Sequence, residues 1–115
     1  MKLLVDNKIP FFREYLKKIK NHDQFIIKYF DDNNLENDDC LNADALFIRS
    51  TTRVNSELLS NSPIKFIGSA TSGYDHFDNN ILNNSKYSTY VASGCNASAV
   101  VNWVLSCIGC LLYTS

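Results

Sequence analysis

Apolar and polar positions along the chain form two recurring patterns, short apolar runs and stretches with apolar residues at helical spacing. The short runs are rich in β-branched and aromatic residues and end at polar residues or glycine, a pattern typical of strands buried inside a sheet. Five such runs predict strands at residues 2–5, 24–30, 43–48, 64–68 and 87–92.

The segments between these strands predict helices and loops. After the first strand, four apolar residues recur at the spacing of one helix face, and they are Phe12, Tyr15, Leu16 and Ile19. The acidic, Asn-rich residues 31–42 predict mostly loop. Residues 55–60 and 76–84 predict short helices, the first capped by Asn55 or Ser56.

Strands that alternate with helical segments predict an α/β fold. Right-handed crossovers then give a parallel sheet covered on both faces, with a flavodoxin-like strand order. Ligands of such folds bind outside the carboxyl ends of the strands. The residues expected there are Asp6, Asp31, Arg49 with Ser50, residues 69–71, and residues 93–94.

The last segment, residues 97–115, is apolar on nearly all sides of the helix that it predicts. A helix on a globular surface exposes about half of itself to water, so this one needs a cover. The run is shorter than the about 20 apolar residues of a membrane span, and it contains the polar residues Asn102 and Ser106. We therefore expect no membrane, and a cover provided by another domain or subunit.

Length and charge narrow the possible functions. A chain of 115 residues is long enough for one domain with its own core. Its 11 basic and 12 acidic residues give a net charge of −1, which supplies no broad positive field for nucleic acid or an anionic membrane. The N-terminus lacks the long apolar core of a signal peptide, so we expect a cytoplasmic protein with reduced thiols.

Two cofactor motifs are incomplete. Cys107 and Cys110 have the spacing of half a zinc or redox motif, but no second pair of ligands accompanies them, and we expect buried small residues and no metal. The chain has four glycines, Gly68, Gly73, Gly94 and Gly109, and they cannot form G-x-G-x-x-G. We expect no nicotinamide cofactor to bind this chain in the usual way.

Two loops could bind an anion. The run from Arg49 to Arg53 (RSTTR) follows the third strand and combines two guanidiniums with three hydroxyls, groups suited to a phosphate or carboxylate. A Ser/Thr-rich turn with solvated arginines explains the same spacing, and both interpretations stay open. Residues 69–73, after the fourth strand, have small side chains that leave backbone N–H groups approachable. Because neighbouring crossover loops converge, we expect the two loops to share an anion.

Two acids flank a histidine at Asp75, His76 and Asp78. This cluster suits a metal, an acid/base site or the start of a helix. A helix that begins near His76 would make Asp75 its N-cap and place Asp78 at the third helical position, where acids stabilise a helix. We therefore interpret the acids as caps and expect His76 to be a surface or supporting residue. The other histidine, His22, has no partner nearby in the sequence.

Four stretches, in order, resemble the D-2-hydroxyacid dehydrogenase family over residues 1 to about 107: LLVDNKIP, ADALFIRSTTRVNSELL, PIKFIGSATSGYDHFD and SGCNASAVVNWV. T-S-G-x-D-H-x-D together with G-C-N-A narrows the resemblance to the erythronate-4-phosphate dehydrogenase branch. The resemblance implies that residues 1–96 form part of the substrate-binding domain. Residues 97–115 would begin a truncated interdomain helix, with the Rossmann NAD domain absent.

The resemblance also implies a function. Enzymes of this branch oxidise 4-phosphoerythronate with NAD in pyridoxine biosynthesis, and we expect a cytoplasmic homodimer when the protein is full length. Ser50 and Thr71 match substrate-contacting positions, and Arg49 and Gly73 are weaker candidates beside them. The catalytic Arg, Glu and His of the family lie downstream, so we expect an inactive N-terminal fragment.

Two departures and two alternatives complete the sequence evidence. Ser93 stands where the family usually has proline, and the resemblance fades from about Ser106.

One alternative function is that of another enzyme of the family, with 3-phosphoglycerate as substrate. The other is a stand-alone flavodoxin-like signalling or binding module, such as a phosphoacceptor receiver domain. Receiver domains carry an acceptor Asp at the end of the third strand and a Lys at the end of the fifth, where this chain has Arg49 and Ser93.

Overall fold

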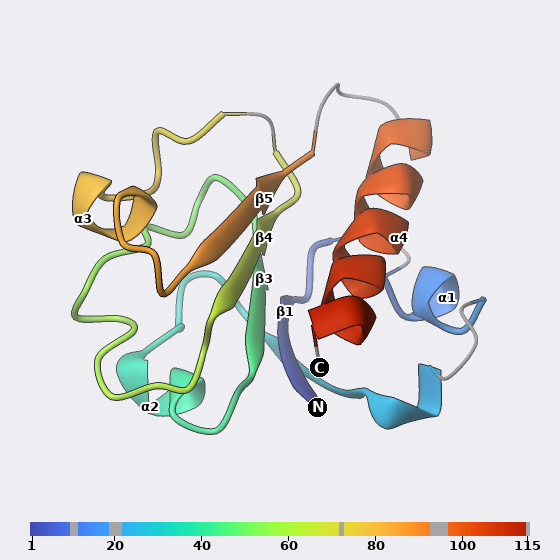
Figure 1. Ribbon diagram of the computed structural model, residues 1–115, viewed down its shortest axis with the longest axis horizontal. Helices are drawn as coiled ribbons and strands as arrows, with labels where there is room; N and C mark the ends of the chain where they lie inside the picture. The colour runs from blue at the N-terminus through green and yellow to red at the C-terminus, as the bar shows by residue number, and fades with distance from the viewer. Residues whose placement is uncertain (10–11, 19–21, 72, 93–96, 115) are drawn as a thin grey trace.

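The computed structural model describes residues 1–9, 12–18, 22–71, 73–92 and 97–114. Its centre is a five-stranded parallel sheet in the order β2-β1-β3-β4-β5 (Figure 1). The strands are β1 (Lys2–Asp6), β2 (Ile26–Phe30), β3 (Ala45–Ile48), β4 (Phe66–Ser69) and β5 (Ser88–Val91). All five predicted strands are therefore confirmed, and so is the flavodoxin-like order.

Helices cover both faces of the sheet, as the pattern predicted. The long helix α4 and the short α1 lie on one face, whereas α2 and α3 lie on the other (Figure 1). The helical elements are α1 (Phe12–Leu16), the 3-10 turn η1 (His22–Gln24), α2 (Asn37–Cys40), α3 (Asn79–Leu82) and α4 (Ala97–Thr114). Ile19 lies outside the described residues, so its predicted place on the first helix is untested.

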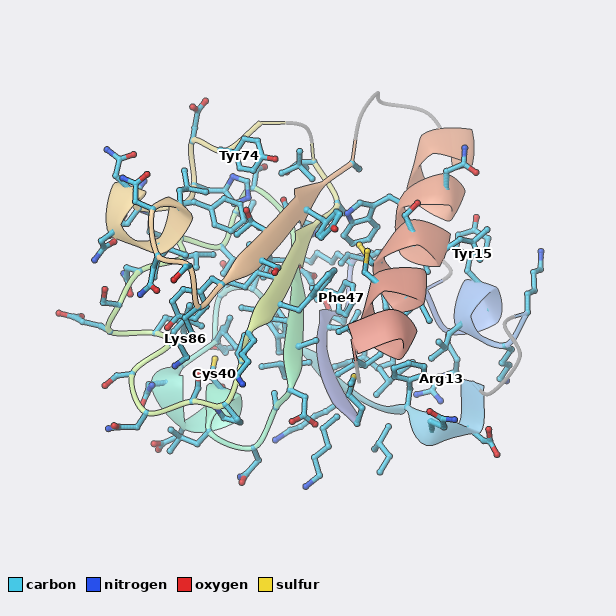
Figure 2. All side chains as sticks on the ribbon, in the orientation of Figure 1. Arg13, Tyr15, Cys40, Phe47, Tyr74 and Lys86 are labelled. Carbon is cyan, nitrogen blue, oxygen red and sulfur yellow. The ribbon has the colours of Figure 1, made fainter. Side chains whose placement is uncertain are left out.

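The core has two halves because successive strand residues point to opposite faces of the sheet. Phe47 belongs to the half beneath α1 and α4, and its ring contacts Phe12 edge-on at 4.8 Å and Trp103 at 5.7 Å between centroids. Figure 2 shows Phe47 between the sheet and α4. The neighbouring residues Leu46 and Ile48 belong to the other half. Central strand β3 is thus buried on both sides, which explains its uninterrupted apolar sequence.

Helix α4 packs on the sheet of its own chain, so the prediction of a cover from another domain or subunit is wrong for this face. Its buried side chains are Trp103, Val104, Cys107, Ile108 and Leu111. The outward positions include Asn102, Leu105 and Ser106. The apolar face of the sheet that packs against α1 and α4 provides the cover. The local sequence of the helix could not show that it would pack on this face. Within the described residues, no helix combines the length and apolarity needed to cross a membrane.

Residues 55–60 form hydrogen-bonded turns, and the predicted helix there is wrong. Asn55 does act as a cap, because its Oδ1 accepts a 2.8 Å hydrogen bond from the backbone N–H of Leu58. The bond from Leu59 N to Asn55 O is long, at 3.4 Å, and Asn61 adopts a left-handed φ of 60°. A left-handed residue cannot continue a right-handed helix, so the segment stops after one turn.

Candidate functional site at the carboxyl edge of the sheet

The loops after β3 and β4 lie side by side. The backbone N–H of Ala70 donates to Ile48 O at 2.8 Å, just where the two strands end. Further on, Val54 and Phe77 form an isolated parallel bridge, in which Val54 N donates to His76 O and Val54 O accepts from Asp78 N, each at 2.9 Å. The predicted convergence of the two loops is therefore confirmed.

Arg53 joins the same loops a second time. Its guanidinium donates to the backbone oxygen of Asp75 at 3.1 Å and forms an ion pair with the carboxylate of Asp78. Because Asp78 compensates its charge, Arg53 is a structural link rather than a freely solvated side chain. The loops enclose an open pocket of about 320 Å³, lined by Ser50, Thr51, Arg53, Asp75 and His76.

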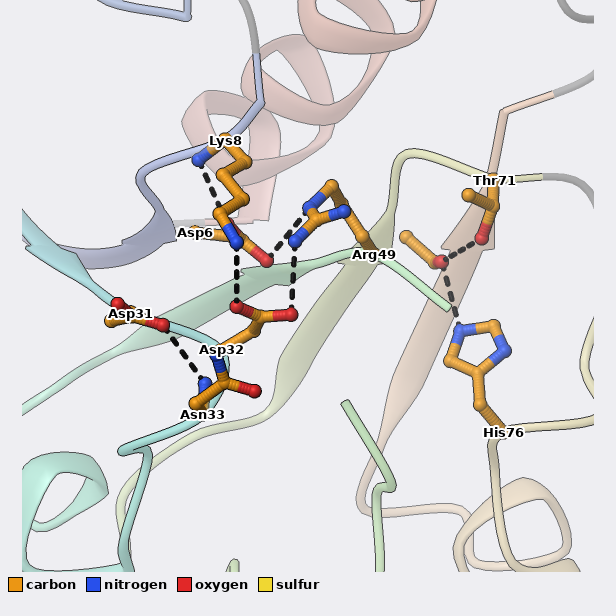
Figure 3. Close-up of polar contacts among 9 residues, drawn as sticks. Asp6, Lys8, Asp31, Asp32, Asn33, Arg49, Thr71 and His76 are labelled. Atoms are coloured by element: carbon orange, nitrogen blue, oxygen red, sulfur yellow. Dashed lines mark hydrogen bonds and ion pairs between the residues drawn. The ribbon is translucent and has the colours of Figure 1, made fainter. Parts of the chain in front are cut away.

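A chain of hydrogen bonds connects Thr71 to His76 through Ser69 (Figure 3). Ser69 Oγ lies 3.0 Å from Thr71 Oγ1 and 2.9 Å from His76 Nε2. Ser69 is fully buried and His76 is only 8% exposed, so His76 is not a surface residue. Burial lowers the pKa of His76 below 6.5, despite the opposing charge of Asp75, which leaves the imidazole neutral at pH 7.

The acids around His76 do not cap a helix in the predicted way. Helix α3 begins three residues later, with Asp78 as its N-cap residue, and the Asp78 side chain forms no capping hydrogen bond. Phe77 is held in the bridge with Val54 and Asp78 has an extended backbone, so a helix cannot run on from His76. The predicted cap roles of Asp75 and Asp78 are therefore wrong, and tertiary pairing is the cause.

Arg49 points toward β1 and β2 (Figure 3). Its Nε donates to Asp6 at 3.0 Å and its Nη2 donates to Asp32 at 3.0 Å. Asp6 is fully buried, and it also accepts the backbone N–H of Lys8 at 2.8 Å. The charge of Arg49 is thus compensated by two carboxylates, and its predicted contact with a substrate stays a prediction.

Asp32 ties the loop after β3 to the end of β2. A hydrogen bond with the side chain of Thr51 is the main reason why the pKa of Asp32 falls to about 2. The positive charges of Lys8 and Arg49 lower this pKa further. Sequence reasoning missed Asp32, because it lies in a run of acids that looked like a solvated loop. These links hold Thr51, and with it the neighbouring Ser50, at the edge of the sheet.

The described glycines do not fit a dinucleotide site. A methyl group on Gly68 would lie 2.9 Å from the ring of Trp103, so the strand backbone here is covered by α4. Gly73 has a φ of +96° in an open turn, and Gly109 lies on α4. Gly94 lies outside the described residues. None of the three glycines described here begins a helix that could hold a pyrophosphate.

Two of the described cysteines have buried, unreactive thiols. Burial raises the pKa of both Cys40 and Cys107 to about 12, which leaves their thiols protonated. Cys110 is half-buried, and its Sγ lies 3.2 Å from the hydroxyl of Tyr90. The prediction of buried small residues is confirmed for Cys107 and only in part for Cys110. Cys95 lies outside the described residues.

Residues 3–104 match the family of D-isomer specific 2-hydroxyacid dehydrogenases, over its catalytic domain. The chain belongs to this family of oxidoreductases. Erythronate-4-phosphate dehydrogenase from Pectobacterium carotovorum subsp. carotovorum (strain PC1) is 42% identical over 106 residues. That alignment covers 92% of this chain and 27% of the relative, so the chain spans about a quarter of the relative's length.

Solved structures agree with the fold. An NAD+-bound 3-phosphoglycerate dehydrogenase from Entamoeba histolytica superimposes with a TM-score of 0.65 at 18% identity, over 80% of this chain and 32% of that protein. The apo form of D-lactate dehydrogenase from Escherichia coli gives a TM-score of 0.62 at 16% identity, over 84% of this chain and 32% of that protein. At these identities the likeness establishes the shared architecture.

Proposed function

We propose that this chain supplies the substrate-binding side of an NAD-dependent dehydrogenase that acts on 4-phosphoerythronate. The observation that carries the proposal is the junction of two hydroxyl-bearing loops, those of Ser50 and Thr71, at the carboxyl edge of a sheet in this enzyme family. The 42% identity to an erythronate-4-phosphate dehydrogenase supports the choice of substrate.

The loops offer donors that suit an anionic hydroxy acid. Ser50 is exposed and lines the pocket, and Thr71 is a half-buried residue of the neighbouring loop. Gly73 has no other group within 4 Å of where a Cβ would lie, so a ligand could approach the glycine from that side. Hydrogen bonds to the carboxylate or phosphate of the substrate would be charge-assisted. Arg49 contributes less, because Asp6 and Asp32 already hold it.

The proposal assigns binding, rather than the chemical step, to this chain. Oxidation of a hydroxy acid transfers a hydride to NAD, and none of the glycines that the structure describes begins a helix suited to the pyrophosphate of that cofactor. His76 is a poor candidate for the base, since its Nε2 is engaged by the buried Ser69. We therefore expect the 115-residue chain alone to produce no NADH from 4-phosphoerythronate.

A direct test is titration of the isotopically labelled chain with 4-phosphoerythronate, followed by NMR. We expect saturable shifts in residues 49–53 and 69–78, and weaker ones with 3-phosphoglycerate, the competing substrate. The double variant Ser50→Ala plus Thr71→Ala should lose these shifts, whereas Ser60→Ala, an exposed serine on a remote turn, should retain them. Unchanged shifts in the double variant would contradict the site assignment.

A chimera tests the activity. Residues 1–104 replace the matching segment of the Pectobacterium relative, and NADH formation is followed with 4-phosphoerythronate and with 3-phosphoglycerate. We expect the chimera to prefer 4-phosphoerythronate, as the parent's name implies. A preference for 3-phosphoglycerate would instead assign this chain to the other substrate.

The resemblance to the family also predicts a homodimer located in the cytoplasm. Sedimentation equilibrium of the chimera, beside the parent enzyme, measures the oligomeric state directly. A monomeric chimera with a dimeric parent would contradict the prediction for this chain.

A further inference from the structure

Ser69 occupies a decisive position between Thr71 and His76. It is the last residue of β4, fully buried, and its hydroxyl has one proton to share between two neighbours at 3.0 and 2.9 Å. Each hydroxyl donates one hydrogen bond, and a neutral imidazole donates from one ring nitrogen only. The direction of the donors along this series of hydrogen bonds therefore depends on which nitrogen of His76 carries the proton.

The two directions have opposite consequences for Thr71. If His76 Nε2 lacks a proton, Ser69 donates to it, Thr71 donates to Ser69, and the Thr71 hydroxyl offers only lone pairs to a ligand. If Nε2 carries the proton, Ser69 accepts from His76 and donates to Thr71. The Thr71 proton is then free for an incoming anion. Only the second direction makes Thr71 a donor for a carboxylate or phosphate.

We propose that His76 is a positioning residue for the substrate. Its Nε2–H donates to Ser69 Oγ, which donates to Thr71 Oγ1 and directs the Thr71 hydroxyl toward the anion before the anion binds. The inference deepens the proposed function and rests on it for the identity of the anion. A hydroxyl that is oriented before the ligand arrives needs no reorganisation when the ligand binds. This is the benefit of the relay formed by His76, Ser69 and Thr71.

The surroundings of His76 fit this role. The loop that carries it is held by the backbone bridge at Val54 and by Arg53, so the ring is fixed from both sides. The charged groups that influence the ring are Asp75 and Arg53, and Arg53 is itself paired with Asp78.

The first test needs no substitution at the relay. Two-bond ¹H–¹⁵N spectra of the labelled chain at about pH 8, above the usual histidine pKa, show which nitrogen of His76 is protonated. A His22→Gln variant identifies the signals of the other histidine. We expect the proton on Nε2 in the ligand-free chain. An Nε2 without a proton would overturn the inference, whether or not 4-phosphoerythronate turns out to be the substrate.

Variants of the chimera supply the second test. Ser69→Ala and His76→Leu should each raise KM for 4-phosphoerythronate about five- to tenfold, the value of one ordinary hydrogen bond, because Thr71 is misoriented rather than removed, with a smaller effect on kcat. His76→Gln should restore most of the affinity, because its amide can donate in place of Nε2–H. The double variant Ser69→Ala plus His76→Leu should have a KM no higher than that of Ser69→Ala, since His76 acts through Ser69.

Ser62→Ala is the matched control, because Ser62 is a buried serine whose hydroxyl donates to Leu59 O away from the pocket. It should lose stability without a change in KM. Equal KM values for wild type, Ser69→Ala and His76→Leu would overturn the inference. An inactive wild-type chimera would count against the proposed function, while the protonation of Nε2 would still decide the role of His76.

Discussion

Trp103 of α4 lies directly over Gly68 of β4, so close that a methyl group on Gly68 would stand 2.9 Å from Cζ2 of the indole. The next residue of the strand is Ser69, the centre of the relay to Thr71. Helix α4 therefore docks on Gly68, and the next residue of β4, Ser69, orients the candidate site. The packing that stabilises the fold and the geometry of the site thus depend on neighbouring residues of one strand.

Gly68→Ala should destabilise the chain by about 1 to 3 kcal/mol, the cost typical of overpacking a core. The added methyl group would also lie 3.0 Å from Phe47, so neither ring can move aside easily. The free energy of unfolding in urea measures the effect. The control is Gly109→Ala on α4, where nothing lies within 4 Å, and it should stabilise the helix by about 0.5 to 1 kcal/mol. Equal stabilities of the two variants would contradict the packing argument.

Arg49→Met should destabilise the chain by about 3 kcal/mol, because it leaves the fully buried carboxylate of Asp6 without its guanidinium partner. Lys8→Met is the control, since Lys8 is exposed and lies 3.5 Å from Asp32, and we expect a change below about 0.5 kcal/mol. Urea unfolding at neutral pH compares the two. If Arg49→Met were as mild as Lys8→Met, the ion pair with Asp6 would not be stabilising the fold.

Acid should weaken the fold partly through Asp32. The pKa of this carboxyl is lowered from 3.8 to about 2 in the folded chain, chiefly by the hydrogen bond with Thr51. The resulting stability is present above pH 3.8 and is lost as the pH falls from 3.8 through about 2. Unfolding free energies measured across this range should decrease less steeply in Asp32→Asn than in the wild type. Parallel curves would contradict the assigned pKa.

The thiols should react in an order set by burial. Burial raises the pKa of Cys40 and Cys107 to about 12, so both should resist alkylation while the chain is folded. Cys110 is half-buried and should react sooner. A Cys95→Ser background restricts the comparison to the described cysteines. Mass spectrometry after timed iodoacetamide treatment locates the modified residues, and rapid labelling of Cys107 would contradict its burial between α4 and the sheet.

The strands were predictable because their signal is local. Central strand β3 is buried on both faces, so its sequence is apolar without interruption. The polar residues that follow, Arg49 and Ser50, mark the point where the chain leaves the sheet. Ser50 and Thr71 could be placed near each other from sequence alone, since neighbouring parallel strands bring their carboxyl ends to one edge.

The errors came from interactions between distant residues. Asp75 and Asp78 have the spacing of helix caps, but the backbone pairing of Val54 with Phe77 delays α3 until Asn79. His76 was expected to be a surface or supporting residue, and nothing in its local sequence indicates the buried Ser69 that it contacts. The start of α3 depends on a loop more than 20 residues away in the chain, whereas Ser69 lies only seven residues before His76.

The sequence by itself determined the α/β class, the five parallel strands, the family and the two hydroxyl-bearing loops, because hydrophobic periodicity and short motifs record local burial. Only the tertiary structure decided three further points: that α4 covers its own sheet, that Arg49 is held by Asp6 and Asp32, and that His76 is linked to Thr71. The first two are contacts between segments far apart in the chain, and the third depends on how the loop after β4 folds back onto its own strand. Packing selects all three among many combinations that the sequence pattern allows equally.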